Sequence, residues 1–148
     1  MDDLPPPIAS PPSNSARRAA AFRHTRDQRA REVGEDYVEM IGDLIAEYGE
    51  ARLTDLARHM GVAAPTAAKV VARLQAEGLV QNRPYRALFL TAEGEALADK
   101  SRVRHAVVKD FLVALGVEAA VAERDSEGME HHVSDETLAA MQRFSEGR

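Results

Sequence analysis

The sequence predicts a mainly α-helical fold that begins with a winged helix-turn-helix and continues into a second helical unit. Three observations support this fold class. Apolar residues recur at spacings of three and four over much of the chain. Two short helical segments flank Gly61 as in a helix-turn-helix, and two short β-prone segments follow them at once. We expect this wing to hold the only strands of the protein.

Composition narrows the class of protein. The chain has 148 residues, 45% of them hydrophobic, which suits one domain or two small units that share a core. No apolar run approaches the roughly 18 residues of a membrane span, and the N-terminus lacks the apolar segment of a secretory signal, so we expect a cytoplasmic protein with no membrane partner. Cysteine is absent. Any metal would therefore be held by oxygen and imidazole nitrogen.

Charge is segregated along the chain, although the net charge is only -5. Residues 16–31 contain six Arg and one Asp. Residues 32–60 contain eight acidic residues against two Arg, and residues 110–148 contain nine against three. Such sorting predicts one basic surface and one acidic site.

The N-terminal part of the chain changes character near Glu35. Residues 1–26 form a Pro/Ser-rich and then Arg-rich arm, which we expect to be disordered because it offers little to bury. Helical spacing of apolar residues becomes regular from Glu35, and Gly49 closes this first helix. We expect the winged helix-turn-helix to span residues 27–97.

The helix-turn-helix and its wing follow directly. Thr54 is the expected N-cap of the second helix, and Gly61 ends that helix with a left-handed turn. Pro65 fits the first turn of a third helix, which ends at Gly78. The β-prone segments around residues 83–86 predict the hairpin that forms the wing.

Three more helices are expected in the C-terminal part. Thr91 caps a long helix that reaches about Leu115. A shorter helix should lie within residues 117–125, and Ser134 should cap the last one. We expect residues 98–148 to form the second helical unit.

The helix-turn-helix predicts a DNA partner. The second helix of such a pair enters the major groove, while the wing and nearby basic residues hold phosphates. The residues expected to contact DNA are Pro65, Thr66, Lys69, Arg73, Arg83 and Arg86. The Arg-rich arm, if it binds, would follow the backbone or enter a minor groove. The alternative is that these helices only pack together or form a protein contact.

A second group of residues indicates a metal. The stretch EGMEHHVS at 127–134 gathers two carboxylates and two imidazoles, which is typical either of a solvated loop or of a metal site that needs further ligands. Asp36 and Glu39 lie three residues apart on the first helix, and His105 lies on the inner side of the long helix. Taken singly, such residues are more often surface carboxylates and a core histidine. We expect Gly128 to permit a turn before the last helix.

From Glu35 to Ser134 the chain resembles the manganese transport regulator branch of the diphtheria-toxin-repressor-like metalloregulators. The stretches that carry the resemblance are EDYVEMI (35–41), the helix-turn-helix and wing, FLTAEGE (89–95), RHAVVKDFLVALGV (104–117) and EGMEHH (127–132). It implies a homodimeric, metal-activated transcriptional repressor whose second unit serves dimerisation and metal binding.

The resemblance also implies a ligand set in which some carboxylates bridge a pair of metal ions. The implied ligands are Asp36, Glu39, His105, Glu127, Glu130 and His131. Four carboxylates and two imidazoles suit Mn²⁺ or Fe²⁺ and tolerate Co²⁺, Zn²⁺ or Cd²⁺. Asp36 and the absence of Cys favour manganese, because iron-responsive relatives tend to carry Met at that place and a Cys nearby. His132 is not a ligand in this pattern.

The expected function is therefore a Mn(II)-responsive repressor of manganese-uptake genes that binds an inverted-repeat operator and is not an enzyme. One alternative is an iron-responsive regulator of the same family. Another is a binuclear metallohydrolase, for which the sequence supplies no separate base, nucleophile or pocket. A third is a winged-helix regulator that responds to a small organic ligand, with the acid/His residues merely structural.

Overall fold

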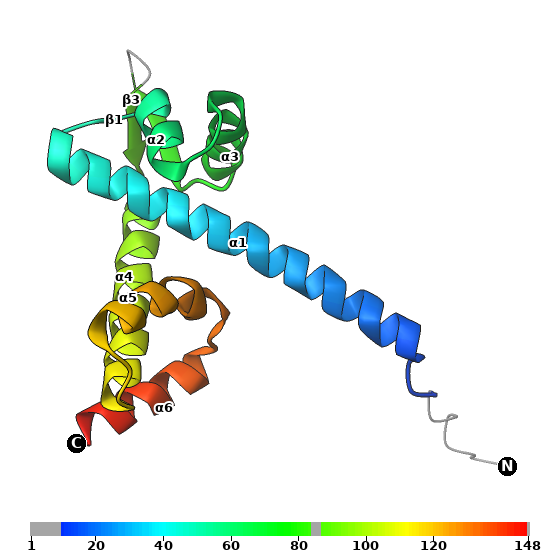
Figure 1. Ribbon diagram of the computed structural model, residues 1–148. Coiled ribbons are helices and arrows are strands. Elements are labelled where there is room, and N and C mark those ends of the chain that lie inside the picture. Colours follow the sequence, from blue (N-terminus) through cyan, green and yellow to red (C-terminus); the bar gives the residue numbers. More distant parts are fainter. Residues whose placement is uncertain (1–9, 84–86, 148) are drawn as a thin grey trace, which may run out of the picture.

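The computed structural model describes residues 10–83 and 87–147, and it confirms the mainly helical fold class. Its elements in chain order are α1 (Asn14–Tyr48), β1 (Ala51–Arg52), α2 (Leu53–Met60), α3 (Ala64–Ala76), β2 (Val80–Arg83), β3 (Ala87–Leu90), α4 (Ala92–Ala114), α5 (Ala119–Met129), the 3-10 turn η2 (Glu130–His132) and α6 (Asp135–Glu146). In Figure 1, α1 crosses the molecule between the winged unit, above it, and the C-terminal helices, below it.

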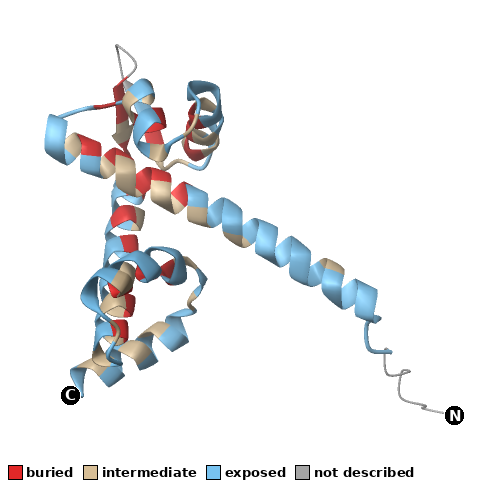
Figure 2. Cartoon of the chain, viewed as in Figure 1, coloured by how far each residue is buried: buried red, intermediate tan, exposed pale blue. Residues whose placement is uncertain are grey.

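Helix α1 is longer than predicted and begins at Asn14, inside the arm that we expected to be disordered. Ser13 caps it, since its side chain accepts a hydrogen bond from the Ala16 amide. The segment that follows is rich in Ala and Arg, which rank among the best helix formers. Propensity and capping therefore make this segment helical although almost none of it is buried (Figure 2).

The winged unit packs its helices around one core. Antiparallel β2 and β3 form the predicted hairpin, with Val80 opposite Leu90. A third strand, β1, pairs with β3 on its other edge, so the prediction that the wing holds the only strands is wrong. The largest fully buried apolar side chains of this core are Val38, Ile41, Leu56 and Leu74.

Strand β1 also changes the start of α2. The N-cap is Arg52, in extended conformation, and no side chain caps the helix. Thr54 is already inside α2, so the expectation that it is the N-cap is wrong. The chain passes straight from a paired strand into the helix, which leaves no room for a separate capping residue. Gly61, with φ of 69°, ends α2 as expected.

Helix α4 connects the winged unit to the C-terminal helices. Thr91 caps it as expected, accepting from the Gly94 amide. Its Ala98 belongs to the core of the winged unit, whereas its Val108 and Leu112 pack with Ala122 of α5 in a second, smaller core. The division of the chain at residues 97 and 98 falls inside this continuous helix and stays a prediction.

Helix α5 runs from Ala119 to Met129 and is longer than predicted. Glu118 caps it by accepting from the amides of Ala120 and Val121. Gly128 lies within this helix, so the expectation that it permits a turn is wrong. Ser134 caps α6 as expected. Among the helices of the described ranges, none is both long and apolar enough to cross a membrane.

Candidate metal centre

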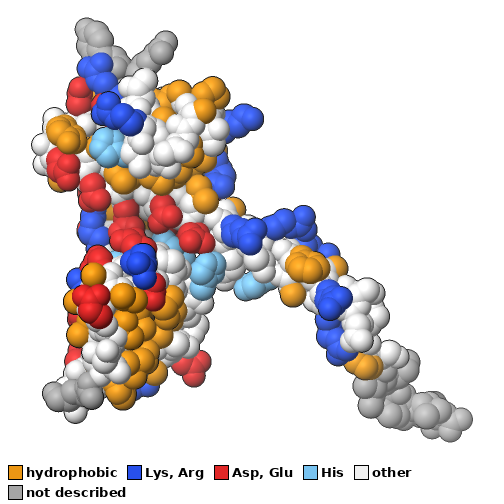
Figure 3. Space-filling model, viewed as in Figure 1, with side chains coloured by type: hydrophobic (Ala, Val, Ile, Leu, Met, Phe, Trp, Pro, Cys, Tyr) orange, Lys and Arg blue, Asp and Glu red, His pale blue; other side chains and the backbone are white. Residues whose placement is uncertain are grey.

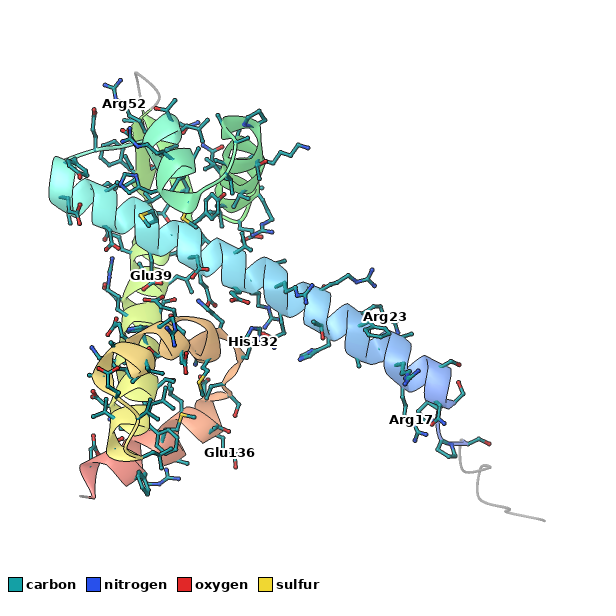
Figure 4. The ribbon with its side chains drawn as sticks, in the orientation of Figure 1. Arg17, Arg23, Glu39, Arg52, His132 and Glu136 are labelled. Atoms are coloured by element: carbon teal, nitrogen blue, oxygen red, sulfur yellow. The ribbon has the colours of Figure 1, made fainter. Side chains whose placement is uncertain are left out.

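Acidic and histidine side chains meet where α1 crosses α4, α5 and η2. In Figure 3, red acidic side chains gather below α1 at the centre of the molecule, while blue Arg and Lys side chains line the N-terminal part of α1. Figure 4 shows Glu39 on the side of α1 that faces the C-terminal helices. The structure thus brings together residues separated by almost one hundred positions in the sequence.

Helical geometry supplies the donors from each element. Asp36 lies one turn after Glu32 and three residues before Glu39, so all three carboxylates share one side of α1. The opposite side of the same turns packs into the core of the winged unit through Tyr37 and Ile41. These carboxylates are therefore fixed to the winged unit by the packing of their own helix.

The first group of possible ligands contains Glu32, Asp36 and His131, each with a donor atom within 4.8 Å of the others. His131 Nε2 lies 3.0 Å from Asp36 Oδ1. Glu32 was not among the predicted ligands. Its position four residues before Asp36 is a signal in the sequence, but many exposed acids of α1 share such spacings.

The second group contains His105, Glu127 and Glu130, again with donor atoms within 4.8 Å. His105 Nδ1 lies 3.6 Å from Glu127 Oε1. The two groups adjoin, because His131 Nε2 of the first lies 3.7 Å from Glu130 Oε1 of the second. Two neighbouring groups of three donors are an arrangement that suits a pair of ions.

Glu39, the remaining predicted ligand, falls in neither group but lies close to both. Burial raises its pKa, and the carboxylates of Glu127 and Asp36 raise it further, while Arg102 opposes them. The Glu39 carboxylate is therefore repelled by the carboxylate of one acid from each group. A cation between the groups would relieve this repulsion.

Buried polar atoms without partners test whether the residues suit a metal. Both Glu130 carboxylate oxygens and His131 Nε2 are buried and make no hydrogen bond within the described residues, although His131 Nε2 lies within ion-pair distance of Asp36 and Glu130. Such atoms are rare in folded proteins, because leaving a buried charged group unpaired costs several kcal/mol. They converge on one place and are all donors that divalent cations accept. The donor set fits a metal.

Protonation in the metal-free site follows from the same burial. Burial raises the pKa of Glu130 to about 7. Burial alone would lower the pKa of His131, but the adjacent Asp36 and Glu35 carboxylates outweigh it and bring that pKa to about 10. Without metal, therefore, protons hold the charge balance that a divalent cation would otherwise supply.

Two further carboxylates orient the imidazoles, and sequence reasoning missed both. His131 donates from Nδ1 to Glu35 Oε2 over 2.6 Å, which leaves Nε2 toward Asp36. His105 donates from Nε2 to Glu123 Oε1 over 2.8 Å, which leaves Nδ1 toward Glu127. A carboxylate on the outer nitrogen of a histidine is the usual way in which proteins fix a metal-ligating ring. In each case the other ring nitrogen is held toward the site.

Arg104 holds η2 in place. Its guanidinium donates to the carbonyl oxygens of Glu130 and Val133 and to the Asp135 carboxylate, and only 12% of its side chain is exposed. These bonds tie the backbone that carries Glu130 and His131 to α4. His132, which the prediction excludes from the ligands, contacts Glu32 of the first group, with 3.0 Å between its Nε2 and Glu32 Oε2.

The predicted DNA contacts lie away from the metal centre, on the winged unit. Pro65, Thr66 and Lys69 are exposed on the first turns of α3. Arg73 is engaged within the protein, because its Nη2 donates to the Ala30 carbonyl of α1 over 2.9 Å. Arg83 ends β2, but its side chain lies outside the described residues, as does all of Arg86.

Two protein-family models match adjoining parts of the chain. "Iron dependent repressor, N-terminal DNA binding domain" matches residues 31–88. "Iron dependent repressor, metal binding and dimerisation domain" matches residues 91–147. The division between them falls close to the start of α4.

Curated relatives carry the name "Transcriptional regulator MntR". One from Escherichia coli O157:H7 is 51% identical over 133 residues, 90% of this chain and 86% of the relative. One from Escherichia coli O6:H1 is 54% identical over 125 residues, 84% of this chain and 81% of the relative. A more distant one from Lysinibacillus sphaericus is 38% identical over 100 residues, 68% of this chain and 72% of the relative.

Solved structures share the fold. The manganese regulator SloR superposes with a TM-score of 0.67 at 28% identity over 78% of this chain. A manganese-dependent transcriptional repressor in complex with manganese gives the same TM-score and identity. This chain spans about half the length of these two structures, 54% and 53% respectively.

Proposed function

The chain belongs to the iron-dependent repressor family, in its MntR branch, and from that membership we propose that it is a repressor switched by Mn(II). Metal-responsive DNA binding is the function of this branch. The identity of the metal, the ligand set and the target genes belong to the proposal. We propose that the genes repressed are those of manganese uptake.

The observation that carries this proposal is the place of Glu130 and His131, whose side chains are both buried. They come from η2, yet His131 Nε2 lies 3.0 Å from Asp36 Oδ1 on α1, and α1 packs into the core of the winged unit. A site shared in this way joins the part of the chain that would read DNA to the part that would form the dimer. Metal binding and DNA binding are then linked through one helix.

We assign the metal to the six ligands implied by the family resemblance and add Glu32 as a seventh donor. The six are Asp36, Glu39, His105, Glu127, Glu130 and His131. The two adjoining groups of donors support two ions in each protomer. Oxygen and imidazole donors without sulfur support Mn²⁺, and Fe²⁺, Co²⁺, Zn²⁺ or Cd²⁺ would occupy the same site.

A bound divalent cation would supply positive charge that neutralises these carboxylates. Other residues of the chain position the ligands. Glu35 and Glu123 hold the two imidazoles in register, and Arg104 holds η2 against α4. With these contacts fixed, α1 and the C-terminal helices keep one relative orientation, and the recognition helices of a dimer keep one spacing.

Spacing matters because a dimer reads two half-sites only if its recognition helices match the helical repeat of DNA. We propose a homodimer on an inverted-repeat operator, with Pro65, Thr66 and Lys69 of α3 in the major groove and Arg83 and Arg86 of the wing on phosphates. Because metal and operator favour the same orientation, each should tighten the binding of the other by the same factor.

The experiment is DNA binding at buffered free concentrations of a panel of divalent metals. Promoter DNA of manganese-uptake genes should bind tightly with Mn²⁺ and weakly with excess chelator. Equal affinity in both conditions would overturn the switch. If Fe²⁺ at its cellular concentration activates DNA binding more strongly than Mn²⁺ does at its own, the iron-responsive alternative would be favoured instead. The MntR relatives favour manganese.

A further inference from the structure

The N-terminal part of α1 packs against almost nothing else among the described residues. Between Asn14 and Arg31, every side chain is exposed except those of Ala19 and Gln28, which are partly buried. Figure 1 shows this segment projecting from the body of the molecule, and we call it the projecting arm (residues 14–31). Packing therefore contributes almost nothing to holding this segment in place.

The arm carries the strongest positive charge of the chain. Its six Arg face a single acid, Asp27. Across residues 10–83 and 87–147, no ion pair joins any of these six guanidinium groups to a carboxylate. Their charge is therefore available to a partner. The six exposed Arg are Arg17, Arg18, Arg23, Arg26, Arg29 and Arg31.

The arm leaves the body beside the helix that would read DNA. Arg73 of α3 donates to the Ala30 carbonyl, and a side chain on Gly34 would touch the same guanidinium. This is where α1 and α3 lie together. Toward the N-terminus from Ala30, α1 projects away from α3 (Figure 1).

The side of the arm that continues the α3-facing surface is basic. Tyr37 and Gly34 lie on the buried face of α1 against the winged unit. Steps of three or four residues toward the N-terminus lead from them to Ala30, Arg26 and then Arg23, all on the same side of the helix. The surface that packs on the winged unit therefore becomes, past α3, a free surface with guanidinium groups.

We propose that the projecting arm is a second DNA-binding element, which contacts phosphates flanking the site held by α3. The proposal rests on the proposed function, since it takes DNA as the partner of α3. From Arg17 to Arg31 the arm spans about 21 Å at 1.5 Å per residue. That length corresponds to about six base pairs of DNA at 3.4 Å each. Guanidinium groups suit phosphate oxygens in number and geometry.

Contacts of this kind carry no sequence information, and they do not involve the metal ligands. They add affinity for any duplex, with metal or without it, and they make binding more sensitive to salt. The arm thus supplies a general attraction, while α3 and the metal decide where and when the protein binds tightly.

The test compares three full-length proteins: the natural chain, a variant with Arg18→Gln, Arg23→Gln, Arg26→Gln and Arg29→Gln, and a matched control with Lys at the same four positions. Gln and Lys both favour helix, so α1 is preserved in each, as circular dichroism will verify. The probe is a mixed-sequence duplex of about 30 base pairs, titrated over a range of salt concentrations in Mn²⁺ and in chelator.

The Gln variant should bind at least about tenfold more weakly at low salt, and its log–log salt slope should fall by about 0.9 for each phosphate that the arm no longer neutralises. The drop should appear in Mn²⁺ and in chelator alike, and the Lys control should keep the natural slope. An unchanged slope in the Gln variant overturns the proposal. So does an unchanged slope accompanied by weaker dimerisation in sedimentation, which would assign the arm to a second copy of the chain.

The outcome is separable from the proposed function. If DNA binding by the natural protein does not depend on Mn²⁺ but the Gln variant has a smaller salt slope, the proposed metal switch is wrong and DNA binding by the arm is supported. If the natural protein responds to Mn²⁺ and the two slopes agree, DNA binding by the arm is wrong and the metal switch is supported.

Discussion

Glu130 and His131 are neighbours in the sequence, but their side chains belong to different groups of possible metal donors. Glu130 groups with His105 and Glu127, and His131 groups with Glu32 and Asp36. The 3-10 turn η2 permits this, because with three residues per turn successive side chains point in widely different directions. The closest approach of the two, 3.7 Å between Glu130 Oε1 and His131 Nε2, is where the two groups adjoin.

Removing either member of this pair should abolish the metal response. In Glu130→Gln or His131→Ala, DNA affinity in saturating Mn²⁺ should fall to the level seen with chelator, because one of the two donor groups is broken. His24→Gln, which removes an exposed histidine of α1 whose ring contacts Gln28 rather than an acid, is the matched control and should keep the response. Fluorescence anisotropy on promoter DNA measures both. Undiminished metal-dependent binding in the Glu130 and His131 variants would leave the acid/His residues a structural role only.

Glu123 should matter for metal affinity without touching the metal. It fixes the His105 ring, and the Lys109 ammonium together with His105 holds the pKa of Glu123 below its usual range, so it stays ionised. Glu123→Gln should weaken Mn²⁺ binding by about 10-fold to 100-fold, the usual cost of removing such a partner.

The control for that change is Asp125→Asn, which removes another half-exposed carboxylate of α5 that contacts Arg124 rather than a histidine. Titration calorimetry gives the affinity, and thermal unfolding in chelator gives the stability. An equal loss of affinity in both variants would show that general negative charge, rather than the orientation of His105, is what Glu123 supplies.

Metal affinity should rise with pH. Because the pKa of His131 is about 10 and that of Glu130 about 7, both must lose a proton before they can bind a cation. Above about pH 7, affinity should increase about tenfold per pH unit through His131, and below it more steeply as Glu130 also becomes protonated. Calorimetry in buffers of different ionisation enthalpy counts the protons released. Metal binding without proton release near neutral pH would contradict these assignments.

Stability of the metal-free protein should change with pH in the opposite sense. A group whose pKa rises on folding stabilises the folded state below its unfolded value and loses that effect as pH rises through the folded value. For the pKa of Glu130 this window runs from its ordinary value of 4.5 to about 7, and for that of His131 from 6.5 to about 10. The unfolding temperature in chelator should therefore decline over these windows, and saturating Mn²⁺ should reverse the decline.

Two helical glycines should respond oppositely to Ala. A methyl group on Gly94 would overlap the Leu79 carbonyl oxygen, so Gly94→Ala should destabilise the protein by about 1–3 kcal/mol. Gly128 lies in α5 with open space beside it, and Gly128→Ala should stabilise by about 0.5–1 kcal/mol. Chemical denaturation of both variants in chelator measures the difference. A loss of stability in the Gly128 variant would contradict its helical conformation.

The order of helices, the wing and most caps could be predicted from the sequence because they depend on local physics. Thr91 and Ser134 cap helices through hydrogen bonds to amides three residues away, and Gly61 ends one through its own backbone freedom. The six predicted ligands came from a resemblance, which preserves spacing but says nothing of distance. Local reasoning failed at Thr54, where a long-range strand pairing set the boundary of α2.

The sequence by itself determined which side chains are present, which of them share a helical face and which family the chain resembles. Only the tertiary structure decided that Glu32 reaches the first group of donors, that Glu35 and Glu123 hold the two imidazoles, and that Arg104 ties η2 to α4. These contacts join residues from about twenty to about one hundred positions apart, and no local pattern encodes them. They arise because packing α1 across α4 and η2 brings distant carboxylates and histidines together around the buried side chains of Glu130 and His131, where a charge without a partner is costly.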